Sequence, residues 1–222
     1  MATCRFIIVD DHPLFRGALA QVLAGAFIGA RIDEAGSYED LLPMLESGVE
    51  PDIIFLDLAM PGVQGLAGLM SLRSQFSTLP VIIVSATDDQ VTIQRCLDCG
   101  AAGYVPKSQP VNKIREAVNT VLAGGIAVPA HLELPPPSDS EVRRTLGRLS
   151  TLTPQQLRVL GMLGEGLLNK QIAFKLNVSE ATVKAHVSAI LMKLGVDSRT
   201  QAVIAINKCG IGAWAQPSAG PA

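Results

Sequence analysis

Residues 51–62 read PDIIFLDLAMPG, and this stretch decides how the chain folds. Four consecutive apolar residues, Ile53 to Leu56, lie between turn-forming residues, which is typical of a strand buried on both faces of a parallel sheet. Asp57 follows at once, so we expect its carboxylate at the carboxyl edge of the sheet, where open α/β folds collect ligands. The Pro61-Gly62 pair favours a tight, exposed turn, so the Asp57 side chain is expected to be reachable from solvent.

The same alternation of patterns continues on both sides of this stretch. Strands are expected at 5–9, 30–32, 53–57, 80–85 and 103–105, with helices from residue 13, at 38–47, from 66, at about 88–99 and at about 111–123. Short buried strands alternating with amphipathic helices indicate right-handed crossovers. The first half is therefore predicted to be an α/β domain with one doubly wound, parallel, five-stranded sheet.

Composition bounds the class of protein. The 222 residues are long enough for two modest domains, and 48% hydrophobic with 17% charged residues excludes a disordered chain. No apolar run approaches the roughly 18 residues that a membrane span needs, and no signal sequence opens the chain, so we expect a cytoplasmic protein without a membrane partner. Cys96 and Cys99 fall within a helical pattern and lack a second ligand pair, so we expect ordinary packing instead of a metal or redox site.

Charge is distributed unevenly along the chain. Residues 1–125 carry 8 Lys and Arg against 14 Asp and Glu, net −6, whereas residues 126–222 carry 10 against 6, net +4. An acidic half able to hold a cation is thus joined to a basic half able to approach a polyanion.

Polar side chains follow four of the predicted strands, and parallel strands deliver them to one edge: Asp10, Asp11, Asp57, Ser85 and Lys107. Three neighbouring carboxylates repel one another unless a cation is present, and Mg²⁺ prefers such hard oxygen ligands. An ammonium and a hydroxyl are suited to phosphoryl oxygens. The set predicts a phosphoryl group transferred to Asp57.

These motifs resemble, in order and spacing, the receiver domain of bacterial two-component response regulators, which has a flavodoxin-like fold. The matching residues are Asp10-Asp11, Asp57 with Met60-Pro61-Gly62 and Gly65, Ser85-Ala86, and Gly103-Tyr104-Val105-Pro106-Lys107. The resemblance implies that a sensor histidine kinase phosphorylates Asp57. It also implies that Mg²⁺ is bound by Asp11, Asp57 and the backbone carbonyl of Ala59, with Asp10 assisting through a water molecule.

The resemblance further implies that the phosphoryl group is bound and sensed by Ser85, Ala86, Lys107 and Tyr104, with Tyr104 changing rotamer as Ser85 moves inward. One departure is Ser108, because the family often has a proline there after a cis peptide bond. A cis bond before a residue other than proline costs about 3 kcal/mol, so the geometry of the Lys107–Ser108 bond is left open.

The second half begins after a proline-rich stretch, residues 135–137, that prevents regular helix and predicts a linker. Thr153, Pro154 and Gln156 form a capping-box pattern at the start of one helix. Asn169 is expected to cap a short helix, Ser179 a longer one, and Gly195 to end it. A short helix, a tight turn and a longer helix indicate a helix-turn-helix, whose second helix enters the major groove.

Helical periodicity turns Val183 and Val187 inward and the base-facing candidates outward: Lys184, Ala185 and Ser188. Residues expected to grip the DNA backbone are Asn169, Lys170, Thr182, Lys193 and Arg199. Segments 152–154, 165–167, 169–173 and 179–187 resemble the LuxR-type DNA-binding domain, and the match continues at Ile190, 193–196 and 199–202, with departures at Gln156, Arg158 and Leu168. The resemblance implies a dimerisation helix carrying Ala202, Val203 and Ile206.

The chain is therefore identified as a member of the NarL/FixJ type of response regulators. We expect a receiver at 1–125, a linker at 126–147, a LuxR-type domain at 148–210 and a flexible tail at 211–222. Phosphorylation of Asp57 is expected to switch dimerisation or domain exposure and thereby promoter binding, with RNA polymerase as a further partner and no independent enzymatic activity. Two alternatives stay open: a phosphorylation-independent DNA binder whose receiver is a dimerisation scaffold, and an adaptor whose basic half binds another protein.

Overall fold

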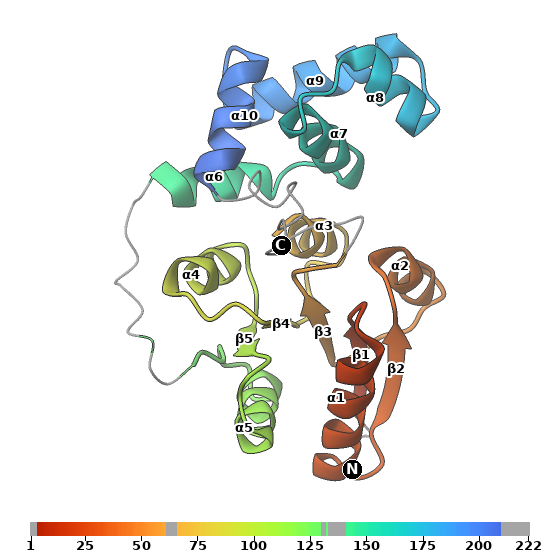
Figure 1. The fold of residues 1–222 in the computed structure, drawn as a ribbon, viewed down its shortest axis with the longest axis vertical. Coiled ribbons are helices and arrows are strands. Elements are labelled where there is room, and N and C mark those ends of the chain that lie inside the picture. Colours follow the sequence, from red (N-terminus) through yellow and green to blue (C-terminus); the bar gives the residue numbers. More distant parts are fainter. Residues whose placement is uncertain (1–3, 61–65, 130–131, 133–140, 210–222) are drawn as a thin grey trace, which may run out of the picture. The chain divides into compact units, whose positions relative to one another are not determined.

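The computed structural model describes residues 4–60, 66–129, 132 and 141–209 (Figure 1). The chain divides into two compact units, the first made mainly of residues before 136 and the second mainly of residues after it. The predicted tail and the middle of the predicted linker, residues 130–131 and 133–140, lie outside the described residues. None of the described helices is both long enough and apolar enough to cross a bilayer.

The first unit contains a five-stranded parallel sheet in the order β2-β1-β3-β4-β5. Its elements are β1 (Arg5–Val9), α1 (Pro13–Ala26), β2 (Arg31–Ala35), α2 (Tyr38–Glu46), β3 (Ile53–Asp57), α3 (Leu66–Gln75), β4 (Val81–Ser85), α4 (Gln90–Asp98), β5 (Gly103–Pro106) and α5 (Val111–Leu122). Strand order changes direction next to β1 and β3, which places their carboxyl ends at a topological switch point. The predicted doubly wound α/β fold is confirmed.

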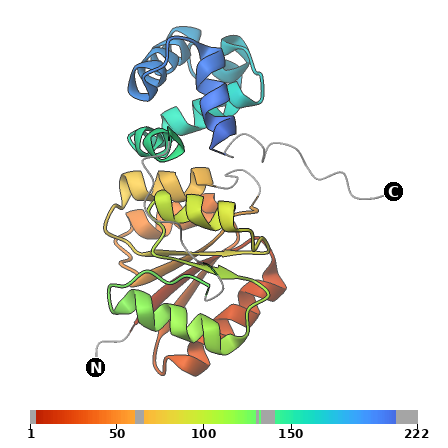
Figure 2. The same ribbon diagram turned by 90° about the vertical axis from the view of Figure 1, so that its left-hand side faces the viewer.

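Helices cover both faces of this sheet, with α1 and α5 on one side and α2, α3 and α4 on the other (Figures 1 and 2). All residues of β3 and β4 are buried, as the unbroken apolar runs predicted. One core cluster joins Phe6 and Phe55 of the sheet to Leu23 of α1 and Val118 of α5. Phe6 and Phe55 meet edge to face with their ring centroids 6.0 Å apart. The buried sheet is thus a rigid base for the side chains at its edge.

The two cysteines of the predicted helical pattern lie inside the first unit. Cys96 and Cys99 lie on α4 and at its end, and both are buried. Burial raises the pKa of the Cys96 thiol, which keeps it protonated and poorly reactive. They contribute to packing beneath α4.

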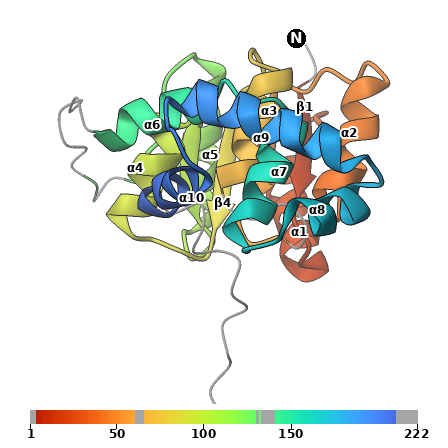
Figure 3. The same cartoon turned by 90° about the horizontal axis from the view of Figure 1, so that it is seen from above.

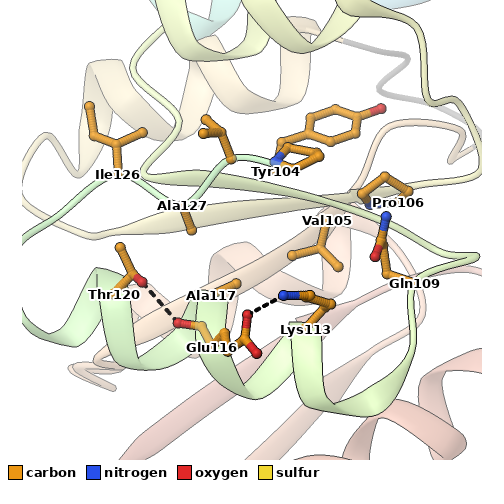
Figure 4. A pocket seen from close by; sticks show the side chains of 12 residues that line it. Tyr104, Val105, Pro106, Gln109, Lys113, Glu116, Ala117, Thr120, Ile126 and Ala127 are labelled. Atoms are coloured by element: carbon orange, nitrogen blue, oxygen red, sulfur yellow. Dashed lines mark hydrogen bonds and ion pairs between the residues drawn. The ribbon is translucent and has the colours of Figure 1, made fainter. Parts of the chain in front are cut away.

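The residues just after α5 run beside the outer strand of the sheet. Ala127 pairs in parallel with Gly103. The backbone N–H of Ala127 donates to Ala102 O at 3.0 Å, and Tyr104 N–H donates to Ala127 O at 2.8 Å. A cavity of about 360 Å³ lies between this segment, β5 and α5, where Lys113 and Glu116 form an ion pair (Figure 4). The start of the predicted linker is therefore bonded to β5.

Gly103 is expected to be required for this close approach. A Cβ at Gly103 would lie 2.9 Å from the Cβ of Ala127 and 3.0 Å from its carbonyl oxygen. Gly103→Ala should therefore lower the free energy of unfolding by about 1–3 kcal/mol, as overpacking of a tight contact does. Urea unfolding followed by circular dichroism measures this change.

Gly17→Ala is the matched control for that substitution, because a Cβ at this helical position would meet no atom within 4 Å. Gly17→Ala should raise stability by up to about 1 kcal/mol through helix propensity. If Gly103→Ala and the unaltered protein had the same free energy of unfolding, the segment at Ala127 would be shown to move away from the new Cβ without loss of stability.

The second unit is entirely helical in its described part. It consists of α6 (Glu141–Leu149), α7 (Pro154–Gly164), α8 (Asn169–Leu176), α9 (Glu180–Leu194) and α10 (Arg199–Lys208). The longest of them, α9, packs against each of the other four, and Figure 3 shows it running past α7 and α8. Val183, Ile190 and Leu194 form its buried stripe. This helix is the centre of the unit.

Three of the four predicted helix ends are confirmed. The Thr153 and Gln156 side chains form both arms of the capping box, the Ser179 hydroxyl accepts from Thr182 N–H, and Gly195 ends α9 in the left-handed conformation at φ +65°. The prediction for Asn169 is wrong, because it is the first residue of α8 and Leu168 is the N-cap. Gln171 satisfies this helix start instead, since its Oε1 accepts from Leu168 N–H at 2.8 Å.

Candidate functional site

The carboxyl ends of the strands place an acidic rim at one edge of the sheet. Val9 pairs with Leu56 across β1 and β3, so Asp10 and Asp57 come next to each other. Carboxylate oxygens of Asp10, Asp11 and Asp57 and a ring nitrogen of His12 all lie within 4.8 Å of one another. Three consecutive residues and one distant residue thus form a single cluster of candidate metal ligands.

Lys107 closes this cluster from the end of β5. Its Nζ lies 2.8 Å from Oδ2 of Asp10 and 2.8 Å from Oδ2 of Asp57, and 4.6 Å from the centre of the Phe15 ring. Burial lowers the pKa of Lys107, but hydrogen bonds with the two carboxylates raise it by more, so the net pKa lies above its ordinary value. The ammonium is charged at neutral pH and offsets part of the carboxylate repulsion.

The expectation that Asp57 is open to solvent is wrong for this state of the molecule. Its side chain is 1% exposed. Lys107 contacts Oδ2, and the N–H of Ala59 donates to Oδ1 at 3.1 Å. Burial at the end of β3, together with these two partners, hides a carboxylate that turn chemistry alone would leave exposed.

His12 is a member of the cluster that sequence reasoning missed. Its Nδ1 lies 2.8 Å from Oδ1 of Asp11, 3.3 Å from Asp10 and 3.8 Å from Asp57, and its backbone N–H donates to Asp10 at 2.8 Å. The ring is more than half exposed, so it lies at the entrance of the rim. The signal in the sequence is its place directly after the two aspartates, next to the proline that begins α1.

The rim fits a divalent metal ion by charge and by donor type. Three carboxylates against one ammonium leave two negative charges uncompensated, which matches the charge of Mg²⁺. Asp10 Oδ2 and Asp11 Oδ1 are shielded from solvent, and each lies 2.8 Å from one nitrogen, Lys107 Nζ and His12 Nδ1 respectively, which leaves each oxygen further acceptor capacity. Hard oxygen atoms with unused acceptor capacity are what Mg²⁺ binds.

The remaining predicted receiver residues lie at or near the same edge. Ser85 ends β4 and is buried, and its hydroxyl accepts from Thr87 N–H at 3.3 Å. Tyr104 is buried on β5, and its hydroxyl donates to Thr87 O at 2.7 Å. Burial raises the pKa of Tyr104, against the opposing effect of Ser85, so the hydroxyl stays protonated near neutral pH. Thr87 therefore connects the two predicted switch residues.

Two smaller residues complete the predicted receiver set. Ala59 is exposed two residues after Asp57, and Ala86 is exposed directly after Ser85. The Lys107–Ser108 bond is trans, as are all other described peptide bonds. The roles assigned to these residues remain predictions.

The helical unit presents a row of polar and small residues on α9. The exposed members are Thr182, Lys184, Ala185 and Ser188. Lys184 is 64% exposed and lies 3.1 Å from Glu180 one turn earlier. The exposed row lies opposite the buried stripe of α9, so one face of this helix is free to enter a groove.

Other residues predicted to contact DNA or a second copy are placed differently. Lys170 is exposed and Asn169 half-buried at the start of α8, whereas Lys193 and Arg199 bond to carbonyl groups inside the unit. Among the predicted dimerisation residues, Ala202 and Ile206 are buried within the unit and Val203 is half-buried. Of these three residues, Val203 alone thus keeps part of its side chain exposed.

Comparison with known proteins agrees with this geometry. Residues 6–119 match the response regulator receiver domain, and residues 150–206 match the luxR family of bacterial regulatory proteins. The chain is 38% identical over 213 residues to the glycerol metabolism activator of Pseudomonas putida, covering 90% of this chain and 93% of that protein. It is 36% identical over 205 residues to the nitrate/nitrite response regulator NarP of Escherichia coli, covering 89% and 92%.

Solved structures show the same fold. A LuxR family DNA-binding response regulator from Silicibacter pomeroyi is 32% identical with a TM-score of 0.50, covering 57% of this chain and 96% of that one. An RcsB–DNA complex is 23% identical with a TM-score of 0.53, covering 93% and 98%. A receiver with an acidic rim, followed by a LuxR-type helix-turn-helix unit, defines a DNA-binding response regulator. Within that class, the chain belongs to the NarL/FixJ type.

Proposed function

We propose that this chain is a transcriptional regulator whose affinity for promoter DNA is switched by phosphorylation of Asp57 by a sensor histidine kinase in the presence of Mg²⁺. The observation that carries the proposal is the rim itself, where Asp10, Asp11 and Asp57 converge with Lys107. The predicted division into receiver, linker, DNA-binding domain and tail is part of this proposal.

In the proposed transfer, a carboxylate oxygen of Asp57 attacks the phosphorus of a phosphohistidine. A new O–P bond forms while the P–N bond breaks, and the electron pair of that bond leaves with the imidazole. Bound Mg²⁺, held by Asp10, Asp11, Asp57 and the Ala59 carbonyl, would neutralise charge on the phosphoryl oxygens. Lys107 starts on the attacked carboxylate, so it needs only a small movement to pair with a phosphoryl oxygen.

We assign the read-out of that event to Ser85 and Tyr104. A hydroxyl from Ser85 is suited to a phosphoryl oxygen, and movement of Ser85 toward the rim would free space near Tyr104. Because Thr87 bonds to both residues, the loop after β4 would move with them. Such a local charge event biases a two-state element, which is how phosphorylation commonly acts.

On DNA, we assign base contacts to Lys184, Ala185 and Ser188. Lys184 reaches a guanine edge or a phosphate, while the two small residues let the helix backbone approach the bases. Thr182, Asn169 and Lys170 supply contacts to the sugar-phosphate backbone. Paired half-sites bound by a phosphorylated homodimer, with RNA polymerase recruited or blocked there, complete the proposal.

Treatment with acetyl phosphate and Mg²⁺ is expected to strengthen DNA binding. The probe is a duplex selected from random sequences by the full-length protein, and fluorescence anisotropy measures its affinity. A regulatory coupling of 1–3 kcal/mol corresponds to a gain of about 5- to 150-fold. Equal affinity with and without the phosphodonor would favour the alternative in which the receiver is a phosphorylation-independent dimerisation scaffold. Failure to select any duplex would favour the adaptor alternative.

A further inference from the structure

Two cationic side chains hold the C-terminal end of α9. The Arg148 Nη1 group, from α6, donates to Leu194 O at 2.8 Å. Lys193 Nζ donates to Thr151 O at 2.8 Å and to Gln156 Oε1 at 2.9 Å. The three acceptors come from α9, from the turn before α7 and from α7 itself. These contacts tie the last turn of α9 to three separate parts of the unit.

The chemistry of a helix end explains why cations suit this place. The last four carbonyl groups of a helix have no partner within the helix, and the end carries a partial negative charge. Gly195 N–H and Val196 N–H turn back to Met192 O and Leu191 O, which leaves Leu194 O for Arg148. A Cβ at Gly195 would lie 2.9 Å from Arg148 Nη1, so the glycine also leaves room for the guanidinium.

Gln156 connects this clamp, defined here as Arg148 and Lys193 with their acceptors, to the start of α7. Its Oε1 accepts from Lys193 Nζ and also from Thr153 N–H at 3.0 Å. The side chain is 8% exposed, so these bonds are sheltered from water. One amide oxygen thus fixes both the capping box of α7 and the end of α9.

The length of α9 makes the orientation of its C-terminal end matter for the position of its N-terminal turns. With 15 residues at 1.5 Å each, α9 is about 22 Å long, so a tilt of 10° at Leu194 would move its first turn by about 4 Å. Contacts with base edges tolerate far smaller errors than that. The exposed row from Thr182 to Ser188 lies in the first and middle turns of α9, so such a displacement would be largest at Thr182.

We propose that Arg148 and Lys193 are positioning residues that set the angle at which α9 enters the major groove, and that neither contacts a DNA phosphate. This inference rests on the proposed DNA-binding function, and for Lys193 it replaces the sequence-based prediction of a backbone contact. Arg148 lies near the end of α6, most of which falls within the predicted linker. The clamp therefore also gives the linker a direct mechanical connection to the recognition helix.

The test compares Arg148→Met with Arg144→Met in the full-length protein. Arg144 is an exposed arginine one turn earlier on the same helix, so both variants lose one positive charge from α6. Affinities are measured for the duplex selected by the unaltered protein and for a scrambled duplex of the same composition, each at several KCl concentrations. Arg148→Lys and Lys193→Met are measured in parallel, with thermal unfolding of every variant.

Relative to Arg144→Met, we expect Arg148→Met and Lys193→Met to weaken binding of the selected duplex about 10-fold and of the scrambled duplex less than 2-fold, a loss of specificity comparable with one mismatched base pair. The slope of log affinity against log salt should stay the same. Arg148→Lys should show an intermediate loss, because one ammonium replaces part of the guanidinium's contact.

Two results would overturn the proposal. A salt slope smaller by about 1 in Arg148→Met or Lys193→Met, with equal loss on both duplexes, would identify a phosphate contact. Arg148→Met or Arg148→Lys binding as Arg144→Met does would show that the clamp does not position α9, while DNA binding itself stands.

If the unaltered protein selects no duplex, the proposed function fails and the clamp has nothing to position. Should Arg148→Met unfold the unit, Arg148→Lys decides the question.

Discussion

Asp57→Asn is expected to abolish phosphorylation of the protein by acetyl phosphate or by a phosphorylated kinase. An amide oxygen is a far weaker nucleophile than a carboxylate and cannot form a stable acyl phosphate. Asp57 is also the member of the rim that Lys107 and the Ala59 N–H both contact, so it is already oriented for attack. Intact-protein mass spectrometry after treatment with the phosphodonor and Mg²⁺ measures the phosphorylated fraction.

Asp33→Asn is the matched control for that experiment, because Asp33 is a carboxylate on β2 that pairs with Arg5 at 2.7 Å and is not part of the rim. It should be phosphorylated as well as the unaltered protein. Chelation of divalent metal should suppress phosphorylation in both proteins that retain Asp57. Full labelling of Asp57→Asn would assign the phosphoryl group to another residue, and full labelling without metal would remove Mg²⁺ from the reaction.

Lys184→Ala is expected to weaken binding of the selected duplex by about 1–3 kcal/mol, which is roughly 5- to 150-fold. The side chain is exposed on one face of α9, and among the described residues Glu180 is the carboxylate that pairs with it. In the bound state the ammonium would exchange this exposed ion pair, worth little, for a base edge or a phosphate. Fluorescence anisotropy at fixed salt measures the loss.

Lys175→Ala is a control of matched chemistry, since Lys175 is 53% exposed on α8 and lies 3.8 Å from Glu165. It removes the same charge from the same unit and should cost less than about 2-fold, as a general electrostatic effect does. A loss in Lys175→Ala equal to that in Lys184→Ala would mean that net charge, and not the face of α9, governs binding.

Much of the fold follows from patterns that are local in the sequence. The uninterrupted apolar runs of β3 and β4 and the caps at Thr153 and Ser179 are each determined by a few neighbouring residues, so they were predictable. Strand β2 was predicted three residues too short, because Asp33 and Glu34 are polar. Tertiary partners explain the difference, since Arg5 pairs with Asp33 and Arg16 with Glu34. Those ion pairs join residues that are far apart in the sequence, so a local pattern cannot reveal them.

The rim was predictable because parallel strands bring their ends together whatever the details of packing. What could not be predicted is how its charges are shared before any phosphoryl group arrives. Lys107 bonds to Asp10 and Asp57 at once, and His12 turns its ring toward Asp11. Likewise, the sequence of a basic domain does not show which of its lysines and arginines contact DNA. In the structure, the Lys193 and Arg199 side chains donate hydrogen bonds to backbone carbonyl groups within the unit.

The segment bonded alongside β5 has a consequence for how this protein behaves at high concentration. Ala127 occupies hydrogen-bonding groups of the outer strand that would otherwise be offered to another chain. At the opposite border of the sheet, β2 carries the charged side chains of Arg31, Asp33 and Glu34. Exposed strands with free backbone groups are the usual starting points of aggregation, and charges discourage it. Each border of the sheet thus carries a feature that discourages pairing of its edge strand with another chain.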